Sequence, residues 1–137
     1  MLGRGGCDFS FSGLKTAAAQ LVGRMERGAL DIRFAADVAA SFQAAVLDIL
    51  GDRLHQAIAL TPDANAVVVS GGVAANQAIR SALTAVAVRS GLPLMAPPMR
   101  LCTDNAVMVA WAAIERMRAG LPPDTLDSKC LPRWSLV

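Results

Sequence analysis

The chain has 137 residues, of which 54% are hydrophobic and only 18% are charged. This length suits one domain that buries roughly two-thirds of its unfolded surface, and the composition excludes a disordered chain because abundant apolar residues can sustain a packed core. The net charge of +2 is too small to indicate nucleic-acid binding through the electrostatic field alone. The apolar fraction is high for so small a chain, so either the core is unusually well packed or a surface that normally covers the chain is missing.

The first half of the chain is predicted to be mainly helical. Residues 8–12 alternate in polarity, which suggests a short strand or an extended segment, and a helix follows over residues 13–27 with a glycine after it. Asp31 is a suitable N-cap for a long second helix, whose apolar residues recur in steps of three and four. This helix should end near Leu60, because Thr61-Pro62 follows.

The second half alternates between strands and helices. The apolar run 66–69, with its three β-branched valines, predicts a strand that is buried on both faces, and residues 92–96 form a second strand candidate. Between them, residues 73–89 predict a helix closed by Gly91, and residues 106–118 predict the last helix. The pattern indicates a strand–helix–strand–helix unit in which the two strands run parallel.

Cysteine usage and hydropathy indicate the compartment. The three cysteines, Cys7, Cys102 and Cys130, are odd in number and form no CxxC pair, which argues against a disulfide framework or a zinc ribbon. No uninterrupted apolar run approaches the roughly 20 residues that span a bilayer. The first six residues lack the apolar stretch of a signal peptide. We therefore expect a soluble, cytoplasmic protein that does not enter a membrane.

The connection between the first predicted strand and the next helix is a candidate binding site. Ligands of parallel sheets sit outside the carboxyl ends of the strands, where Gly71 and Gly72 allow close approach of the backbone and positive φ. A helix N-terminus behind them would offer free N–H groups to an anion. Asn76, expected in the first helical turn, can both donate to and accept from a ribose or a base. The alternative is a tight turn whose glycines serve packing alone.

The segment before the last predicted helix is a second candidate. Asp104 could supply a hard oxygen ligand to a metal at the same edge of the sheet. From the residue types alone, Thr103 or Asp104 as a simple helix N-cap is the favoured interpretation, and the two roles can coexist. Cys102 has no histidine near it in sequence, so we interpret it as a buried structural thiol. His55 is the only histidine, and a single histidine cannot build a metal site. The residues alone therefore identify no catalytic group.

Three motifs occur in an order that is typical of one family. They are DFSFSGLKT at residues 8–16, VVVSGGVAAN at residues 67–76 and CTDNA at residues 102–106. From about residue 3 to residue 120, the chain resembles the C-terminal part of the TsaD or Gcp family, the tRNA threonylcarbamoyladenosine synthases. Members of this family were once called O-sialoglycoprotein endopeptidases or glycoproteases. Three ordered motifs make the resemblance more specific than any one of them alone.

The resemblance implies an α/β fold. The chain would be a helix-rich portion of one lobe of an actin-like (Hsp70-like, ribonuclease H-like) ATPase fold with a short parallel βαβ unit. Residues 1–120 would form this partial C-terminal lobe, and residues 121–137 an irregular tail. The implied reaction moves a threonylcarbamoyl group from threonylcarbamoyl-adenylate to the adenosine adjacent to the anticodon of tRNA.

The resemblance also implies site residues and cofactors. Gly71, Gly72 and Asn76 would bind an adenylate or ATP-type ligand, and Asp104 would bind one divalent metal, iron or else zinc, beside two histidines. Those histidines form a His-x-x-x-His pair in the family's N-terminal lobe, and this sequence has no such pair. We therefore interpret the chain as a fragment with half of the active site absent, and we expect it to be inactive alone.

The implied partners are tRNA, threonylcarbamoyl-adenylate, a paralogous protein and an ATPase subunit. Alone, the chain should expose a large apolar patch and self-associate. One alternative is a metalloprotease of the O-sialoglycoprotein endopeptidase type, but the sequence contains no His-Glu-x-x-His motif. A second is the nucleotide-binding lobe of another actin-like ATPase or a sugar kinase, in which the CTDN segment is not expected. A third is a stand-alone helical interaction domain with a purely structural glycine turn.

Overall fold

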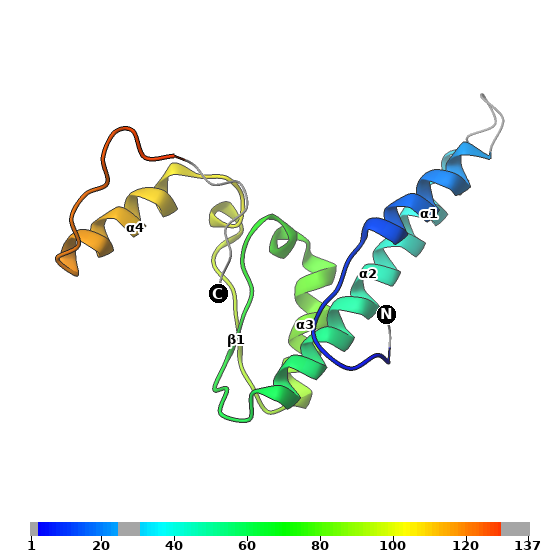
Figure 1. The fold of residues 1–137 in the computed structure, drawn as a ribbon. Coiled ribbons are helices and arrows are strands. Elements are labelled where there is room, and N and C mark those ends of the chain that lie inside the picture. Colours follow the sequence, from blue (N-terminus) through cyan, green and yellow to red (C-terminus); the bar gives the residue numbers. More distant parts are fainter. Residues whose placement is uncertain (1–2, 25–30, 130–137) are drawn as a thin grey trace. The chain divides into compact units, whose positions relative to one another are not determined.

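The computed structural model describes residues 3–24 and 31–129, and it divides into two units between Thr103 and Asp104. The first unit contains the helices α1 (Ser12–Gly23), α2 (Ile32–Leu60) and α3 (Gln77–Arg89), the strands β1 (Val67–Val68) and β2 (Leu94–Met95), and 3₁₀ turns at Gly72–Ala75 and Met99–Leu101 (Figure 1). The second unit contains one helix, α4 (Ala106–Arg118). The predicted domain boundary at residue 120 stays a prediction.

The N-terminal segment and α1 differ in part from expectation. Residues 8–11 form neither a strand nor a helix, and α1 starts at Ser12. A strand needs a hydrogen-bonded neighbour, and the two described strands pair with each other. α1 ends at Gly23, earlier than predicted, with Arg24 as its C-cap. The predicted end of this helix, at residues 27–28, lies outside the described residues.

Both ends of α2 are confirmed. The Asp31 carboxylate accepts a hydrogen bond from the backbone N–H of Arg33 at 3.3 Å, and the helix ends at Leu60. Among the described residues, α2 is the one helix that is long and apolar enough to cross a membrane, with a mean hydropathy of 1.4 over its most apolar 18 residues. Core helices of soluble proteins share these properties, so length and hydropathy assign no membrane segment here.

The two strands form a short parallel sheet. Val67 pairs with Leu94 and Val68 with Met95, so the strands run parallel as predicted. The prediction of a strand at 66–69 that is buried on both faces is wrong, because β1 has two residues and Val68 is 72% exposed. Its register partner Met95 is exposed on the same face of the sheet. α3 contacts β2, whereas no described element buries Val68 and Met95.

The described core of the first unit centres on α3. This helix packs against α2, and its buried residues are Ile79, Leu83, Val86 and Ala87. The predicted end of the helix is confirmed, because Gly91 adopts a φ of +74° and the Leu92 N–H donates to the Ala87 carbonyl at 2.9 Å. The predicted start at residue 73 is wrong, because a 3₁₀ turn comes first and α3 begins at Gln77.

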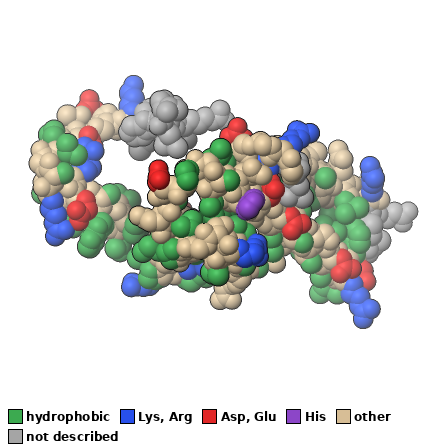
Figure 2. All heavy atoms as spheres, turned by 90° about the horizontal axis from the view of Figure 1, so that it is seen from below, with side chains coloured by type: hydrophobic (Ala, Val, Ile, Leu, Met, Phe, Trp, Pro, Cys, Tyr) green, Lys and Arg blue, Asp and Glu red, His purple; other side chains and the backbone are tan. Residues whose placement is uncertain are grey.

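The second unit contains no buried residue in its described range. α4 spans Ala106–Arg118 as predicted, and every one of its residues is exposed. Hydrophobic side chains are visible across the surface in Figure 2. Helices with a short parallel sheet are compatible with the predicted α/β class.

Candidate functional site

The glycine turn, defined here as residues 70–76, leads from β1 to α3. Gly71 has a φ of +83° and a ψ of 177°, a conformation that side-chain-bearing residues rarely adopt. A Cβ atom placed on Gly71 or Gly72 would meet no atom within 4 Å. The glycines therefore do not accommodate a close neighbour within the described chain. Gly71 serves the backbone conformation, and the space in front of the turn is open to a ligand.

Asn76 caps α3, which corrects the prediction that it lies in the first helical turn. Its Oδ1 atom accepts hydrogen bonds from the backbone N–H groups of Ala78 at 2.9 Å and Ile79 at 3.2 Å. The predicted anion site at this helix start needs free N–H groups, and the Asn76 side chain occupies two of them. Any phosphate at the glycine turn therefore depends on other groups than these two amides.

The other end of the Asn76 amide is held by α2. Its Nδ2 atom donates to Oε1 of Gln43 at 3.1 Å. Gln43 and Asn76 border a groove of about 490 Å³ that is otherwise lined by apolar side chains of α1, α2 and α3, including Val38, Phe42 and Ile79. The bond to Gln43 fixes the orientation of the Asn76 side chain against the helix pair.

Arg80 connects the glycine turn to the segment that follows β2. Its Nε donates to the Ala74 carbonyl, and its Nη2 donates to the Pro97 carbonyl at 2.9 Å and to Sγ of Cys102 at 3.0 Å. Cys102 is 2% exposed, which confirms the interpretation of a buried structural thiol. No sequence motif marks Arg80, because its partners are two backbone carbonyls and a thiol.

Asp104, the predicted metal ligand, is exposed at the start of the second unit. The interpretation of Thr103 or Asp104 as the N-cap of the last helix is wrong. Asn105 is the cap, and its Oδ1 accepts from the backbone N–H of Met108 at 2.9 Å. Asp104 therefore does not cap α4. Within residues 3–24 and 31–129, no three His, Cys, Asp or Glu side chains gather into a group that could hold a metal ion.

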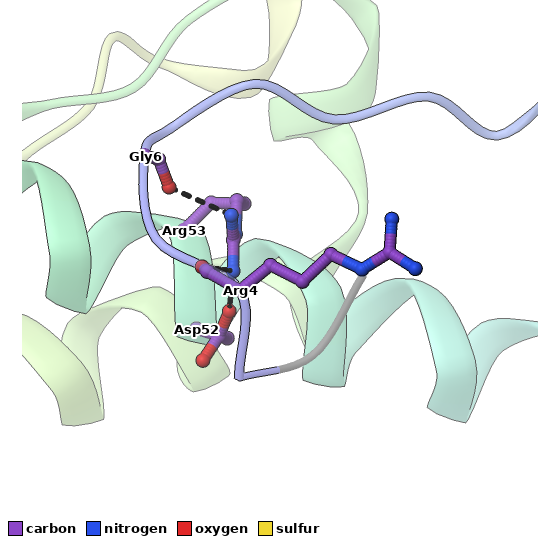
Figure 3. A network of polar contacts seen from close by, with 4 residues as sticks. All are labelled: Arg4, Gly6, Asp52 and Arg53. Atoms are coloured by element: carbon purple, nitrogen blue, oxygen red, sulfur yellow. Dashed lines mark hydrogen bonds and ion pairs between the residues drawn. The ribbon is translucent and has the colours of Figure 1, made fainter.

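Arg53 forms a second polar network that the sequence did not indicate. This α2 residue is 5% exposed, and its guanidinium donates to the carbonyls of Gly6 at 2.6 Å and Arg4 at 2.8 Å (Figure 3). It also donates to the carboxylate of Asp52. The hydrogen bond from Arg53 lowers the pKa of the Asp52 carboxyl. The network fastens the glycine-rich N-terminal segment to α2, ahead of the DFSFSGLKT motif.

Comparison with known proteins gives one consistent family. Residues 2–111 match the model of the TsaD family, described as tRNA N6-adenosine threonylcarbamoyltransferase. Proteins of that name from Gluconobacter oxydans, Granulibacter bethesdensis and Rhodospirillum rubrum are 59%, 57% and 50% identical to the chain over 98%, 99% and 99% of its length. The chain spans 38%, 37% and 38% of these relatives, respectively. The chain belongs to the TsaD family.

Proposed function

We propose that the chain is the C-terminal portion of a tRNA N6-adenosine threonylcarbamoyltransferase. The family match over residues 2–111 carries this proposal. The reaction moves a threonylcarbamoyl group from threonylcarbamoyl-adenylate to the adenosine adjacent to the anticodon. The chain spans only 38% of the Gluconobacter oxydans relative, and we therefore propose that the activity belongs to a longer protein and that the chain alone is inactive. In that protein, the chain forms part of one lobe of an actin-like ATPase fold.

A chimera tests the assignment directly. The chain replaces the matching part of the Gluconobacter oxydans relative, and formation of threonylcarbamoyladenosine in tRNA is measured by nucleoside mass spectrometry with the partner proteins of that relative present. We expect the chimera to modify tRNA and the 137-residue chain alone to show no activity. A folded but inactive chimera would contradict the assignment, and activity of the chain alone would contradict its fragment character.

The glycine turn supports an adenylate or ATP-type ligand at Gly71, Gly72 and Asn76. Both glycines face open space, so a ligand can approach the backbone closely. Oδ1 of Asn76 already accepts two backbone N–H groups, and Nδ2 uses one of its two N–H groups on Gln43. The second Nδ2 N–H is what Asn76 can offer to a ligand. The ligand atom that it contacts is therefore an acceptor, such as a ribose oxygen or a ring nitrogen.

Titration with AMP tests this site. We expect backbone amide NMR shifts at Gly71 and Gly72, and we expect Asn76→Ala to weaken binding by about five- to tenfold because one hydrogen bond is lost. Asn105→Ala is the matched control, since it removes the corresponding N-cap from α4. Equal binding by Asn76→Ala and the unchanged chain would favour a purely structural turn.

Asp104 is proposed as one ligand of a divalent metal, iron or else zinc, in the longer protein. Its exposed carboxylate supplies a hard oxygen donor, which suits such an ion. One carboxylate does not make a site, and the described residues gather no set of three ligands. Residues 3–24 and 31–129 by themselves therefore do not fit a tightly held metal, and we derive no reaction step through one. Submicromolar iron or zinc binding by the chain alone, measured by titration, would contradict this view.

The partners and the compartment follow from the same assignment. For the longer protein we propose tRNA and threonylcarbamoyl-adenylate as substrates, a paralogous protein and an ATPase subunit as partners, and the cytoplasm as location. For the chain alone we propose self-association through exposed apolar side chains, such as Val68, Trp111 and Met117. A concentration-independent monomer in size-exclusion chromatography, without binding of an apolar dye, would contradict self-association. Within the described ranges, no observation favours the endopeptidase or the sugar kinase.

A further inference from the structure

One side chain joins two segments that lie far apart in the sequence. Arg80 of α3 donates to the Ala74 carbonyl in the glycine turn, and it also donates to the Pro97 carbonyl and to Cys102 Sγ. Pro97 and Cys102 flank the 3₁₀ turn Met99–Leu101. This turn precedes Asp104 in the sequence, so Arg80 links the proposed nucleotide segment to the segment before the proposed metal ligand.

The surroundings of Arg80 make this link rigid. Ala74 is fully buried and Cys102 is 2% exposed, so water does not readily replace the guanidinium at either partner. The Cys102 thiol also donates to the Pro97 carbonyl at 3.7 Å. A guanidinium is planar and fixes the directions of its donors, which makes its hydrogen bonds geometrically specific. A shift of the glycine turn must therefore either break the bond to Ala74 or move the guanidinium relative to Pro97 and Cys102.

We propose that Arg80 is a positioning residue that couples the glycine turn at residues 70–76 to the segment 97–102. A change of conformation in one segment is transmitted to the other through the guanidinium. The functional meaning of this coupling rests on the proposed function, in which the glycine turn contacts the nucleotide. The coupling itself exists without a ligand and can be measured without one. It differs from a merely local role, in which Arg80 satisfies each carbonyl independently.

A double-mutant cycle read by amide hydrogen exchange tests the coupling. Gly71→Ala places a side chain at a φ of +83° and so strains the glycine turn. Exchange is followed at the N–H groups of Leu101 and Cys102, which donate to Pro98 and Met99 at 2.8 and 3.0 Å. We expect Gly71→Ala to speed this exchange about three- to tenfold when Arg80 is present, and to have no effect in the R80A background.

Two further variants separate coupling from loss of structure. Arg80→Lys keeps the charge but replaces the fork by a single nitrogen, so the effect of Gly71→Ala should vanish there as well. Arg89→Ala, at an exposed position at the end of α3, should leave the effect intact. If R80A unfolds by circular dichroism, Arg80→Lys supplies the measurement.

Two results of the double-mutant cycle would overturn the coupling through Arg80. An effect of Gly71→Ala that persists unchanged without the arginine overturns the proposal, and so does the lack of any effect at Leu101 and Cys102 in the parent chain. The test is independent of the nucleotide. A failure of AMP to bind contradicts the proposed site and leaves the coupling standing, whereas a failure of the cycle removes the coupling and leaves AMP binding intact.

Discussion

α3 and α4 are helices of equal length in opposite surroundings. Each has 13 residues and starts after an asparagine whose Oδ1 accepts hydrogen bonds from the backbone N–H groups of the first turn. α4, with the sequence AVMVAWAAIERMR, is more apolar than α3, with QAIRSALTAVAVR. Nevertheless α3 contains four buried residues, whereas every residue of α4 is exposed. The more apolar helix is the one without a core.

The contrast shows that apolar composition does not by itself create a core. A helix buries a face only where another element lies against it, and α3 lies against α2 and β2. A helix that is apolar on most sides, like α4, is typical of one that is covered on several faces. This fits a chain that spans about 38% of the length of its relatives. The described residues bury few of their apolar side chains, so the high apolar fraction does not reflect unusually good packing.

The largest expected effect comes from truncating a large side chain in each helix. Leu83→Ala in α3 should lower the free energy of unfolding by about 2–4 kcal/mol, because Leu83 is 8% exposed and its loss leaves a cavity. Met117→Ala in α4 should change it by less than about 0.5 kcal/mol, because Met117 is 73% exposed. Urea unfolding followed by circular dichroism measures both. Similar losses for the two variants would show that α4 is packed in solution.

Removing the N-caps Asn76 of α3 and Asn105 of α4 compares the same two helices, with a smaller expected effect on stability. Asn76→Ala should lower the free energy of unfolding by about 1–2 kcal/mol, because it removes the cap of a packed helix together with the bond to Gln43. Asn105→Ala removes the cap of an unpacked helix. It should therefore reduce helix content without moving the urea midpoint of the first unit. A midpoint shift of the same size for both variants would contradict the difference in packing.

Local signals in the sequence predicted the element ends that depend on local chemistry. Asp31 begins α2, Thr61-Pro62 follows its end, and Gly91 closes α3, because capping and positive φ need particular residues at particular positions. The span 106–118 of α4 was also predicted, although its cap is Asn105 and not an earlier residue. Asparagine, aspartate and threonine all cap helices, so residue type alone could not choose among neighbours.

Features that depend on tertiary contacts could not be predicted from the sequence. The apolar run at residues 66–69, which contains three valines, predicts a strand buried on both faces. Only the faces that another element reaches are buried, and Val68 is 72% exposed. The 3₁₀ turn before α3 is stabilised in part by Arg80, which approaches Ala74 from within the helix. For the site, the sequence identified the glycine turn, Asn76 and Asp104 as candidates. It could not show that the Asn76 amide already donates one hydrogen bond to Gln43 and accepts two from backbone N–H groups.

The smallest expected effect concerns two carboxylates, one in each unit, whose pKa values are both lowered. The Arg53 hydrogen bond lowers the pKa of Asp52 below its ordinary value of 3.8, and the Thr125 side chain lowers the pKa of Asp127. A carboxyl with a lowered pKa in the folded state stabilises the fold above its unfolded pKa and loses this contribution as the pH falls through its folded pKa. Asp52→Asn should therefore lower the thermal midpoint at pH 7, and the deficit should begin to shrink below about pH 4 and be lost as the pH falls through the lowered pKa of Asp52.

Asp127→Asn is the matched control for this experiment. Asp127 is exposed in the second unit, whereas Asp52 is bonded to the buried Arg53, which holds the N-terminal segment on α2. The second unit has no buried residue in its described range, so the lowered pKa of Asp127 should not enter the unfolding of the first unit. The thermal midpoints of the first unit from pH 7 to pH 3 should therefore be parallel for Asp127→Asn and the parent chain. They should converge only for Asp52→Asn. A constant deficit in the thermal midpoint of Asp52→Asn across this pH range would contradict the prediction. It would mean that Arg53 holds the carbonyls of Arg4 and Gly6 on α2 without help from the charge of Asp52.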